Sequence, residues 1–462
     1  MVFSGLLFLF LYLPITLAVY YVVPRAWRNL VLFIVSLVFY GWGEPVYIAL
    51  MLFSITLNYV AGFLVEKWRG DKKAKRAVIV SVILNLVLLV FFKYYDFLAG
   101  SINDLTGLSL PILHLSLPIG ISFYTFQAMS YPIDLYRRDA ELQRSYVRFG
   151  AFVTLFPQLI AGPIIRYKDV ADQLNFRIHS AERFSSGVIK FSVGLAKKVL
   201  LANNIGLLWD ATIARPTASL SVMSAFLGVV AFTFQIYFDF SGYSDMAVGL
   251  GRMLGFEFLE NFNYPYIARS ITDFWRRWHI SLSTWFRDYV YIPLGGNRVS
   301  TAKHYRNIFV VWMLTGFWHG ASWNFLLWGV YFAVLLMVEK AVLLKWLKKI
   351  PAVFSHIYTM VLVMLSWAIF AIEDFGTLGA YLGQLFGGGA FADAQFCYDV
   401  RSFAVLLVIL VLASTPLPAK LYGRLSEKTR AVLAPVLVLL ALLLSTAYLV
   451  DSTYNPFLYF RF

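Results

Sequence analysis

The histidine at position 319 is the residue whose surroundings point most directly to chemistry. It belongs to the stretch TGFWHG, residues 315–320, inside an apolar run that extends from residue 308 to residue 340. Ionisable groups at membrane depth are costly and usually face the protein interior or a water-filled cavity. A buried, hydrogen-bonded imidazole stays neutral, which is the form that a general base needs. His319 therefore has two interpretations, a proton acceptor in catalysis or a histidine that hydrogen-bonds across a helix interface.

A second histidine ends the aromatic and basic stretch Trp275-Arg276-Arg277-Trp278-His279. The spacing predicts one helix over residues 270–291, with an aromatic stripe on one side and a polar, basic stripe on another. Such a helix is expected to lie in the membrane interface. The two guanidinium groups could hold the phosphates of a coenzyme, because guanidinium binds phosphate through two parallel hydrogen bonds. The alternative is a membrane-surface helix with a packed histidine.

Two aspartates, Asp239 and Asp245, flank residues 241–244. Asp245 is expected to pair with Arg252, or to cap a helix that begins after Gly242. The alternative role for the two carboxylates is to keep a cavity polar.

The sequence predicts no metal site. The two histidines are 40 residues apart, and the chain contains neither an H-E-x-x-H motif nor a pair of cysteines, since Cys397 is its one cysteine. A G-x-S-x-G nucleophile motif and a phosphate-binding glycine loop are also absent from the sequence.

The elements that must position these residues are membrane helices. Of the 462 residues, 60% are hydrophobic and 14% are charged, whereas soluble domains have roughly 45–50% apolar and about 25% charged residues. Several apolar windows of about 20 residues are long enough to cross a bilayer. The net charge of +14 is typical of cytoplasmic loops rich in Lys and Arg, so we do not expect nucleic-acid binding. The composition predicts an all-α polytopic membrane protein and argues against a soluble enzyme.

The order of the spans follows from the basic loops. Six basic residues lie between positions 67 and 76, which marks this segment as cytoplasmic. Counting back, with a short span over residues 30–42, Arg25 and Arg28 are also cytoplasmic, and so are residues 166–183 and the arginines between positions 137 and 148. We expect about ten or eleven crossings and a single membrane domain over residues 1–462.

Three segments are expected to depart from regular spans. Residues 151–165 are short and interrupted by prolines and a glycine, so they need protein or a wet cavity around them. Residues 187–208 carry three lysines and are expected to lie partly along the interface. The apolar run over residues 308–340 would make a helix of about 50 Å, which exceeds the hydrocarbon core of roughly 30 Å. We expect a break at Gly316 and Gly320, whose spacing also permits a close helix approach.

At these motifs the chain resembles the membrane-bound O-acyltransferases, the MBOAT family. Within that family it is most similar to the bacterial alginate O-acetyltransferases and their exopolysaccharide-acetylating relatives. The resemblance covers nearly the whole chain and is most specific in residues 273–298 and 315–324. It also includes the segments at residues 1–10, 156–163, 235–250, 260–298, 314–328 and 455–460.

The resemblance implies a bundle of tilted, broken and re-entrant helices around a central channel. His319 matches the catalytic histidine of the family. His279 matches a second histidine of the alginate-type and D-alanyl-transfer branches, where many eukaryotic relatives have asparagine. The donor would be a cytoplasmic thioester, acetyl-CoA, with no cofactor bound permanently. Arg276, Arg277, Trp275 and Trp278 would contact the donor.

The acceptor implied by the resemblance lies outside the bacterial inner membrane. It is a polysaccharide, as in alginate biosynthesis, or an extracytoplasmic SGNH-type acetyltransferase partner that passes the acetyl group on. Two other functions stay open at this point. One is a teichoic-acid type D-alanyl transferase fed by a carrier protein. The other is a transporter or channel, which would be expected to have inverted repeats, and the sequence lacks that symmetry.

Overall fold

The fold is that of a computed structural model, which describes all residues except 161, 452–456 and 459–462. The described part of the chain consists of helices and the loops between them and contains no strand. Eight of its helices are long and apolar enough to cross a membrane, and a shorter apolar helix covers residues Phe8–Val22. The prediction of an all-α polytopic membrane protein is therefore confirmed.

Eight long spans are fewer than the ten or eleven crossings expected from the apolar runs. Some of those runs form helices that are too short or too polar to qualify. For example, α2 (Arg28–Gly41) has 14 residues and α5 (Ile121–Arg137) has 17.

The chain forms two compact units, and each is described by itself. Unit 1 comprises Met1–Phe191 and Tyr243–Leu259, and unit 2 comprises Ser192–Gly242 and Glu260–Phe462. Two helices, α9 (Ala181–Ala196) and α11 (Val222–Met253), contribute residues to both units.

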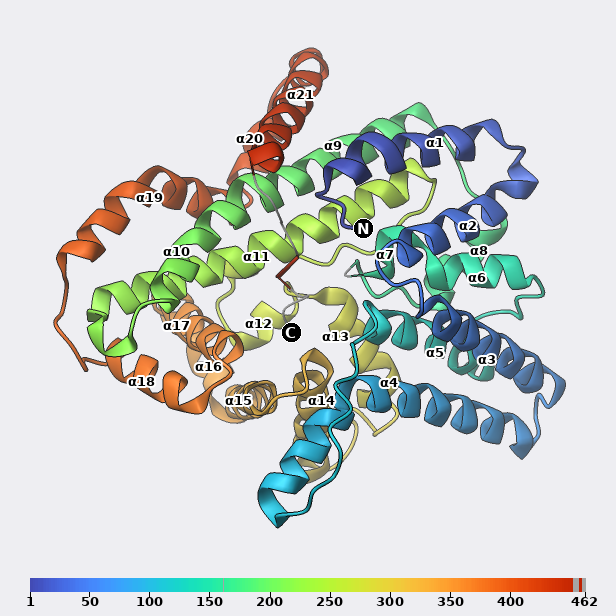
Figure 1. Ribbon diagram of the computed structural model, residues 1–462, viewed down its shortest axis with the longest axis horizontal. Helices are drawn as coiled ribbons and strands as arrows, with labels where there is room; N and C mark the ends of the chain where they lie inside the picture. Colours follow the sequence, from blue (N-terminus) through green and yellow to red (C-terminus); the bar gives the residue numbers. More distant parts are fainter. Residues whose placement is uncertain (161, 452–456, 459–462) are drawn as a thin grey trace. The chain divides into compact units, whose positions relative to one another are not determined.

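Unit 1 includes the helices α1 to α8 (Figure 1). Their bounds are η1 (Phe8–Tyr12), α1 (Leu13–Val22), η2 (Arg25–Trp27), α2 (Arg28–Gly41), α3 (Ile48–Lys67), α4 (Lys72–Thr106), α5 (Ile121–Arg137), α6 (Tyr146–Thr154), α7 (Phe156–Leu159) and α8 (Tyr167–Asn175).

Amide side chains fasten α3 to α4 inside unit 1. Asn58 and Asn85 are fully buried and exchange two side-chain hydrogen bonds of 3.0 Å, and Ser81 donates a third bond to the Asn58 oxygen. In lipid, such interhelical bonds satisfy polar groups that find no water. They fix the register of the two spans.

The interrupted segment at residues 151–165 is shielded by protein, as predicted. It divides into α6 and α7, and its described residues are buried. The carbonyl of Phe152, at the end of α6, accepts hydrogen bonds from the side chains of Gln127 (2.6 Å) and Gln158 (2.7 Å). The helix break thus replaces backbone hydrogen bonds with buried amide donors, which is what a break at membrane depth requires.

Loops predicted to be cytoplasmic meet at one end of unit 1. Tyr59, in the second half of α3, donates to the carbonyl of Arg144 (2.7 Å), and Lys168 pairs with Asp139 (2.9 Å). These contacts join α3, the loop after α5 and the start of α8. The structure is therefore consistent with placing these basic segments on one side of the membrane.

Unit 2 contains the helices on either side of the break near residue 320 and the late spans of the chain (Figure 1). Its further elements are η3 (Lys197–Ala202), α10 (Asn203–Ile213), η4 (Thr217–Ser219), η5 (Pro265–Ile267), α12 (Ile271–Trp275), α13 (Ile280–Phe286), η6 (Arg287–Tyr291), α14 (Thr301–His319), α15 (Trp323–Val338), η7 (Glu339–Leu343), α16 (Leu344–Leu347), α17 (Ala352–Ala371), α18 (Phe375–Leu385), α19 (Ala394–Ala413), α20 (Leu417–Gly423) and α21 (Glu427–Asp451).

The break predicted within residues 308–340 is confirmed. Helix α14 ends at His319, Gly320 is extended, and α15 begins at Trp323. The two helices pack so closely that a Cβ atom on Gly316 would overlap the carbonyl oxygen of Phe325. The glycine permits this approach, and the break places His319 at a helix end.

Residues 187–208, predicted to lie partly along the interface, belong to one continuous helical stretch over residues 181–213 that is long and apolar enough to span a membrane. Its position relative to the interface stays a prediction. Two of its lysines pair with aspartates of α11. Lys190 pairs with Asp245 in unit 1 (3.0 Å), and Lys198 pairs with Asp239 in unit 2.

The same pairs bear on the roles expected for the two aspartates. Asp245 pairs with Lys190 (3.0 Å), and its expected pair with Arg252 stays a prediction. The expected cap is wrong, because no helix begins after Gly242 among the described residues and α11 runs through this position. Asp239 fits the alternative role, since it lines a cavity described below.

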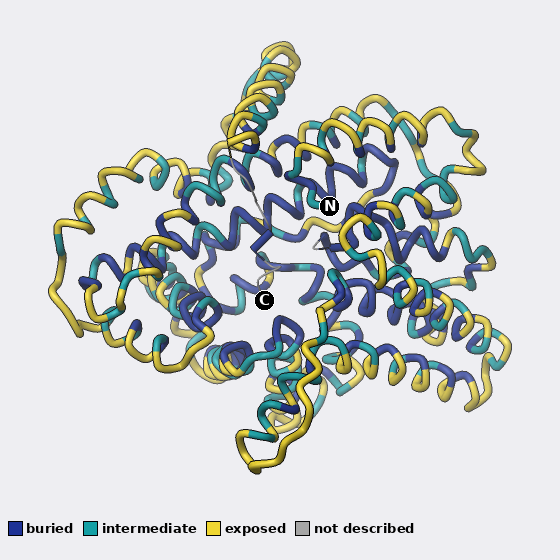
Figure 2. The backbone as a smooth tube through the Cα atoms, in the orientation of Figure 1, coloured by how far each residue is buried: buried dark blue, intermediate teal, exposed yellow. Residues whose placement is uncertain are grey.

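Helices α19 and α21 expose apolar side chains along most of their length (Figure 2). Both are long and apolar enough to cross a membrane. Their exposed surfaces are therefore suited to contact with lipid chains.

Candidate active site

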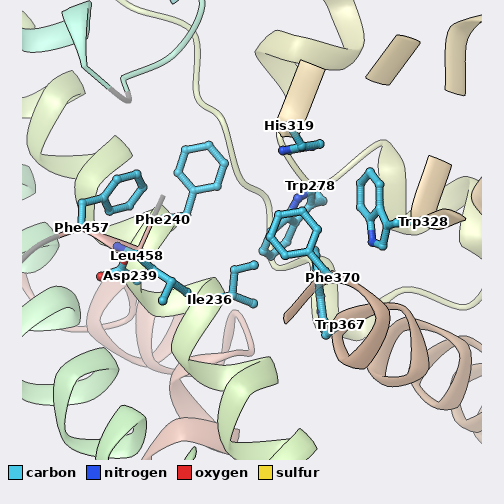
Figure 3. A pocket seen from close by; sticks show the side chains of 10 residues that line it. All are labelled: Ile236, Asp239, Phe240, Trp278, His319, Trp328, Trp367, Phe370, Phe457 and Leu458. Atoms are coloured by element: carbon cyan, nitrogen blue, oxygen red, sulfur yellow. The ribbon is translucent and has the colours of Figure 1, made fainter. Parts of the chain in front are cut away.

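His319 lines a small cavity in unit 2 (Figure 3). The cavity has a volume of about 20 Å³, which is room for one water molecule. Its walls come from helices far apart in the sequence, and the lining residues are Ile236, Asp239, Phe240, Trp278, His319, Trp328, Trp367, Phe370, Phe457 and Leu458.

Aromatic rings surround the His319 imidazole. Ring centroids of Trp328, Phe370 and Trp318 lie 5.0, 5.3 and 5.1 Å from it, and all three rings stand edge to face with it. The side chain is 6% exposed. These rings shelter the imidazole from lipid and water, and an environment of this kind favours its neutral form.

Asp239 supplies the polar corner of the cavity. Its carboxylate pairs with Lys198, and the two side chains are 3% and 5% exposed. The second carboxylate oxygen accepts a hydrogen bond from the backbone N–H of Leu458 (2.8 Å). Phe457, the neighbour of Leu458, packs against Phe240 at 5.8 Å. The buried ion pair therefore holds a piece of the C-terminal segment as part of the cavity wall.

The prediction of a single helix over residues 270–291 is wrong. Helix α12 ends at Trp275, α13 begins at Ile280, and η6 continues to Tyr291. His279 interrupts the helix with a left-handed backbone (φ 45°, ψ 53°), a conformation that is uncommon for residues other than glycine. Backbone hydrogen bonds to the segment before α12 hold the break, including that from Ile280 N–H to the carbonyl of Asn261 (3.0 Å).

Asn261 also fixes the tautomer of His279. Its side-chain oxygen accepts from the backbone N–H and the hydroxyl of Ser281 (3.1 and 2.9 Å), which identifies this atom as the carbonyl oxygen. The Nδ1 atom of His279 lies 3.2 Å from that oxygen and must therefore carry the hydrogen. Nε2 then has the lone pair, and it has no hydrogen-bond partner within the described residues although the side chain is fully buried.

The two histidines lie near the same cavity but do not both line it. The rings of Phe240 and Trp318 pack against His279, at centroid distances of 4.7 and 5.9 Å. Phe240 is itself a wall of the cavity, whereas His279 is not among the lining residues. His279 therefore lies behind the wall that His319 shares.

A second cavity of about 250 Å³ lies beside α12 and carries basic side chains. Arg276, Arg287 and Lys340 line it together with Trp275, Trp312 and other residues of α13 and α14. The ring of Trp275 packs on Trp312 (4.4 Å) and on Trp328 of the His319 cavity (5.6 Å). Tryptophan rings thus form a partition between the basic cavity and the histidine.

A third cavity of about 440 Å³ adjoins the second one and shares Thr272 and Arg276 with it. Arg269 and Lys348 add two more cationic side chains there. Arg277, by contrast, pairs with Asp273 (3.0 Å) and donates to the carbonyl of Asn263 (3.2 Å), and it lines neither cavity. The two neighbouring arginines of the sequence therefore have different surroundings.

A buried carboxylate positions α12. Glu339, which is fully buried, accepts hydrogen bonds from the backbone N–H groups of Ile271 (2.6 Å) and Thr272 (2.9 Å) and from the Thr272 hydroxyl (2.8 Å). An anion at a helix N-terminus satisfies N–H groups that have no partner inside the helix. Glu339 thereby fixes the helix that carries Trp275.

Of the sequence-predicted residues, the structure places His319 and Trp278 in one cavity and Trp275 and Arg276 in the other. Sequence reasoning missed Lys340 and Arg287 as partners of Arg276, and Trp328, Trp367 and Phe370 as walls around His319. The i, i+3 spacing of Trp367 and Phe370 was a usable signal, since it places both rings on one helix face.

Comparisons with known proteins give one consistent family. The profile of the membrane-bound O-acyltransferase family, MBOAT, matches residues 137–373. A probable alginate O-acetylase of Pseudomonas putida is 40% identical, with 100% of both chains covered. Another, of Pseudomonas aeruginosa, is 45% identical over 81% of this chain and 72% of its own. A peptidoglycan O-acetyltransferase of Helicobacter pylori is 34% identical over 81% of this chain and 77% of its own.

Proposed function

We propose that this chain, which belongs to the membrane-bound O-acyltransferase family, uses His319 to move an acetyl group from cytoplasmic acetyl-CoA to an extracytoplasmic acceptor. Its family and its helices make it a multi-pass membrane O-acetyltransferase. The observation that carries the proposal is a buried imidazole that lines a small cavity, and a wall of that cavity, Trp328, packs against Trp275 of a basic cavity.

The proposed reaction is a direct acyl transfer with general base catalysis. Neutral His319 takes the proton of the acceptor hydroxyl as its oxygen attacks the thioester carbonyl carbon. The new C–O ester bond forms, the C–S bond breaks, and the imidazolium returns the proton to the leaving thiolate. A positioned base contributes typically about 10²–10⁴-fold to the rate. Holding both reactants in a narrow site supplies much of the remainder.

His279 is proposed to assist His319 from behind the cavity wall. Because Asn261 holds its Nδ1 as a donor, the Nε2 lone pair is available for a hydrogen bond. Entry of the donor would require Phe240 or Trp318 to move, and Nε2 would then accept a hydrogen bond from donor or acceptor. In this role His279 orients a reactant and does not supply the principal base.

Acetyl-CoA is proposed to enter through the two basic cavities. Arg276, Arg287 and Lys340 surround the second cavity, and Arg269 and Lys348 extend the positive charge into the third. Guanidinium and ammonium groups bind phosphates strongly. The basic segment around residues 345–349 is expected on the cytoplasmic side, where acetyl-CoA is available.

Within this route Arg276 is a better phosphate ligand than Arg277, which is engaged with Asp273. Trp275 would line the passage, and Trp278 would contact the acetyl end in the His319 cavity. The thioester would then have to pass the partition of tryptophan rings to reach His319.

The acceptor is proposed to be a cell-envelope polysaccharide outside the bacterial inner membrane. The support is that similar proteins are named for alginate and peptidoglycan acetylation. Transfer could proceed directly or through an extracytoplasmic SGNH-type acetyltransferase, since both would present a hydroxyl group to the same cavity.

The test uses purified protein in proteoliposomes with labelled acetyl-CoA and a polysaccharide acceptor. His319→Ala should lower transfer by about 10²–10⁴-fold, with unchanged protein level and size-exclusion profile. His356→Gln is the matched control, because His356 is a half-buried histidine of α17 outside the cavity. Undiminished transfer by His319→Ala would reject the assignment.

A second experiment tests whether acetyl-CoA is the donor and whether Arg276 binds it. Arg276→Gln should raise the KM for acetyl-CoA and leave kcat nearly unchanged, whereas Arg424→Gln, at an exposed arginine, should change neither. A carrier-protein donor would be indicated if free acetyl-CoA gave no transfer while an acyl-carrier protein did. That result would favour the D-alanyl type of enzyme.

A further inference from the structure

Unit 1 contains a compact cationic cluster that the proposed reaction does not use. Arg28 begins α2, Arg177 follows α8, and both approach Tyr20 near the end of α1. Their guanidinium carbons lie 5.1 and 6.0 Å from the centre of the Tyr20 ring. The cluster therefore joins two segments that the sequence places on the cytoplasmic side.

Hydrogen bonds build the cluster around Tyr20. The buried tyrosine donates to the carbonyl of Leu254 (2.9 Å) and accepts from Nε and Nη2 of Arg177 (3.2 and 3.1 Å). His179 lies 2.9 Å from the same hydroxyl, and Nη1 of Arg28 lies 3.3 Å from both nitrogens of its ring. Two guanidinium groups and an imidazole thus share one small volume.

The chain provides no carboxylate for these arginines within its described residues. Nearby cations differ in this respect, because Arg166, Lys168 and Lys190 each pair with an aspartate. The Nε atom of Arg28 is buried and has no hydrogen-bond partner among the described residues. Like charges held together in this way are favoured when an external anion neutralises them.

The surroundings of the cluster indicate where that anion comes from. Val22 and Trp27, on either side of the turn into α2, are 85% and 58% exposed. An exposed tryptophan between arginines is typical of the headgroup region, where its ring anchors a helix end. Phospholipid headgroups place phosphate groups at this level, and basic pockets on the cytoplasmic side bind such headgroups.

We propose that Arg28, Arg177 and His179 form a binding site for the phosphate of an anionic phospholipid in the cytoplasmic leaflet. Arg28 supplies the Nη2 donors that its contacts with His179 leave unused, and Arg177, held by Tyr20, contributes charge from the other side. The bound phosphate ties the turn after α1 to the segment after α8. The lipid is therefore a structural ligand of unit 1.

The test compares lipids on the full-length protein purified in a neutral detergent. Native mass spectrometry should show several-fold greater retention of phosphatidylglycerol than of phosphatidylcholine, and phosphatidylglycerol should raise the melting temperature. The double variant Arg28→Gln/Arg177→Gln should lose both effects, and a variant at an exposed arginine of unit 1, Arg144→Gln, should keep them. Equal retention by wild type and double variant would overturn the proposal.

Two further arms separate a lipid from a soluble anion, and lost binding from lost folding. Inorganic phosphate should not reproduce the stabilisation, and an equal effect of free phosphate would overturn the lipid assignment in favour of a soluble ligand. If the double variant fails to fold, Arg28→Lys provides the readout, because lysine keeps the charge but not the two-donor geometry. It should bind phosphatidylglycerol more weakly than wild type, and unchanged binding would contradict the role of Arg28.

Discussion

The buried pair of Lys198 and Asp239 gives a prediction whose magnitude follows from the structure. Both side chains are almost completely buried, and Asp239 also accepts from the Leu458 N–H at the cavity wall. Lys198→Met leaves the carboxylate without its principal counter-charge, which typically costs about 3–5 kcal/mol in a buried pair. The single variant should therefore lose about this much stability.

The double variant Lys198→Met/Asp239→Asn removes the buried charge together with its partner. The asparagine oxygen can still accept from the Leu458 N–H, so the cavity wall keeps its hydrogen bond. We expect it to be more stable than Lys198→Met alone, with a coupling energy of about 2–3 kcal/mol. Lys190→Met is the control, because its pair with Asp245 is 22% and 14% exposed and should cost less.

The assay is reversible unfolding of the purified protein in mixed micelles with increasing denaturing detergent, followed by tryptophan fluorescence and circular dichroism. The wild type, the two single variants and the double variant are measured under one condition. The differences between their unfolding free energies give the coupling energy between positions 198 and 239. Should Lys198→Met prove no less stable than the double variant, the carboxylate at position 239 does not depend on Lys198, and the reasoning from burial fails.

Three other predictions follow from packing and charge. Glu339→Ala should cost about 2–6 kcal/mol, because the backbone N–H groups of Ile271 and Thr272 lose their acceptor at about 1–3 kcal/mol each, and Glu339→Gln should cost less in the same unfolding assay. Gly316→Ala should cost about 1–3 kcal/mol through overlap with Phe325, whereas Gly379→Ala, with open space around its Cβ, should gain about 0.5–1 kcal/mol; similar values for both glycines would contradict the packing argument. Burial and the nearby guanidinium groups of Arg28 and Arg177 lower the pKa of His179 from 6.5 to about 4. The unfolded state then binds more protons between these values, so lipid-free protein should lose stability as the pH falls from 6.5 towards 4. His179→Gln should lack this part of the pH dependence, and an unchanged slope would refute the assignment.

The membrane architecture was predictable because it depends on the length and hydrophobicity of single segments of the sequence. The apolar run at residues 308–340 is too long for one crossing, and the glycines at positions 316 and 320 mark where it bends. The partners of the lysines in residues 181–213 could not be predicted, because they are distant in sequence. Lys198 and Lys190 meet aspartates on α11, and the spacing within one helix contains no information about charges on another.

The break at His279 could not be read from helical periodicity for a related reason. The aromatic pattern continues across residues 270–291 as if the helix were unbroken. The residue that favours the break is Asn261, which lies 18 residues before His279 in the sequence. Asn261 pairs its carbonyl with Ile280 and its side chain with His279. These long-range hydrogen bonds outweigh the local preference for helix. They stabilise the break although His279 must adopt a left-handed backbone conformation.

The burial of His319 in the candidate site was predictable, whereas the residues that enclose it were not. Burial of an imidazole followed from the apolar context of His319, but its ring neighbours come from α14, α15 and α17 and depend on how these helices pack. The choice between Arg276 and Arg277 was partly readable, since Asp273 stands four residues before Arg277 and such pairs meet on a helix face. Arg276 lacks that partner and lines both basic cavities. The same helix end thus pairs Arg277 with Asp273 and leaves Arg276 lining both cavities. Under the proposed donor route, substitution of Arg276 should lower donor affinity, and substitution of Arg277 should lower stability.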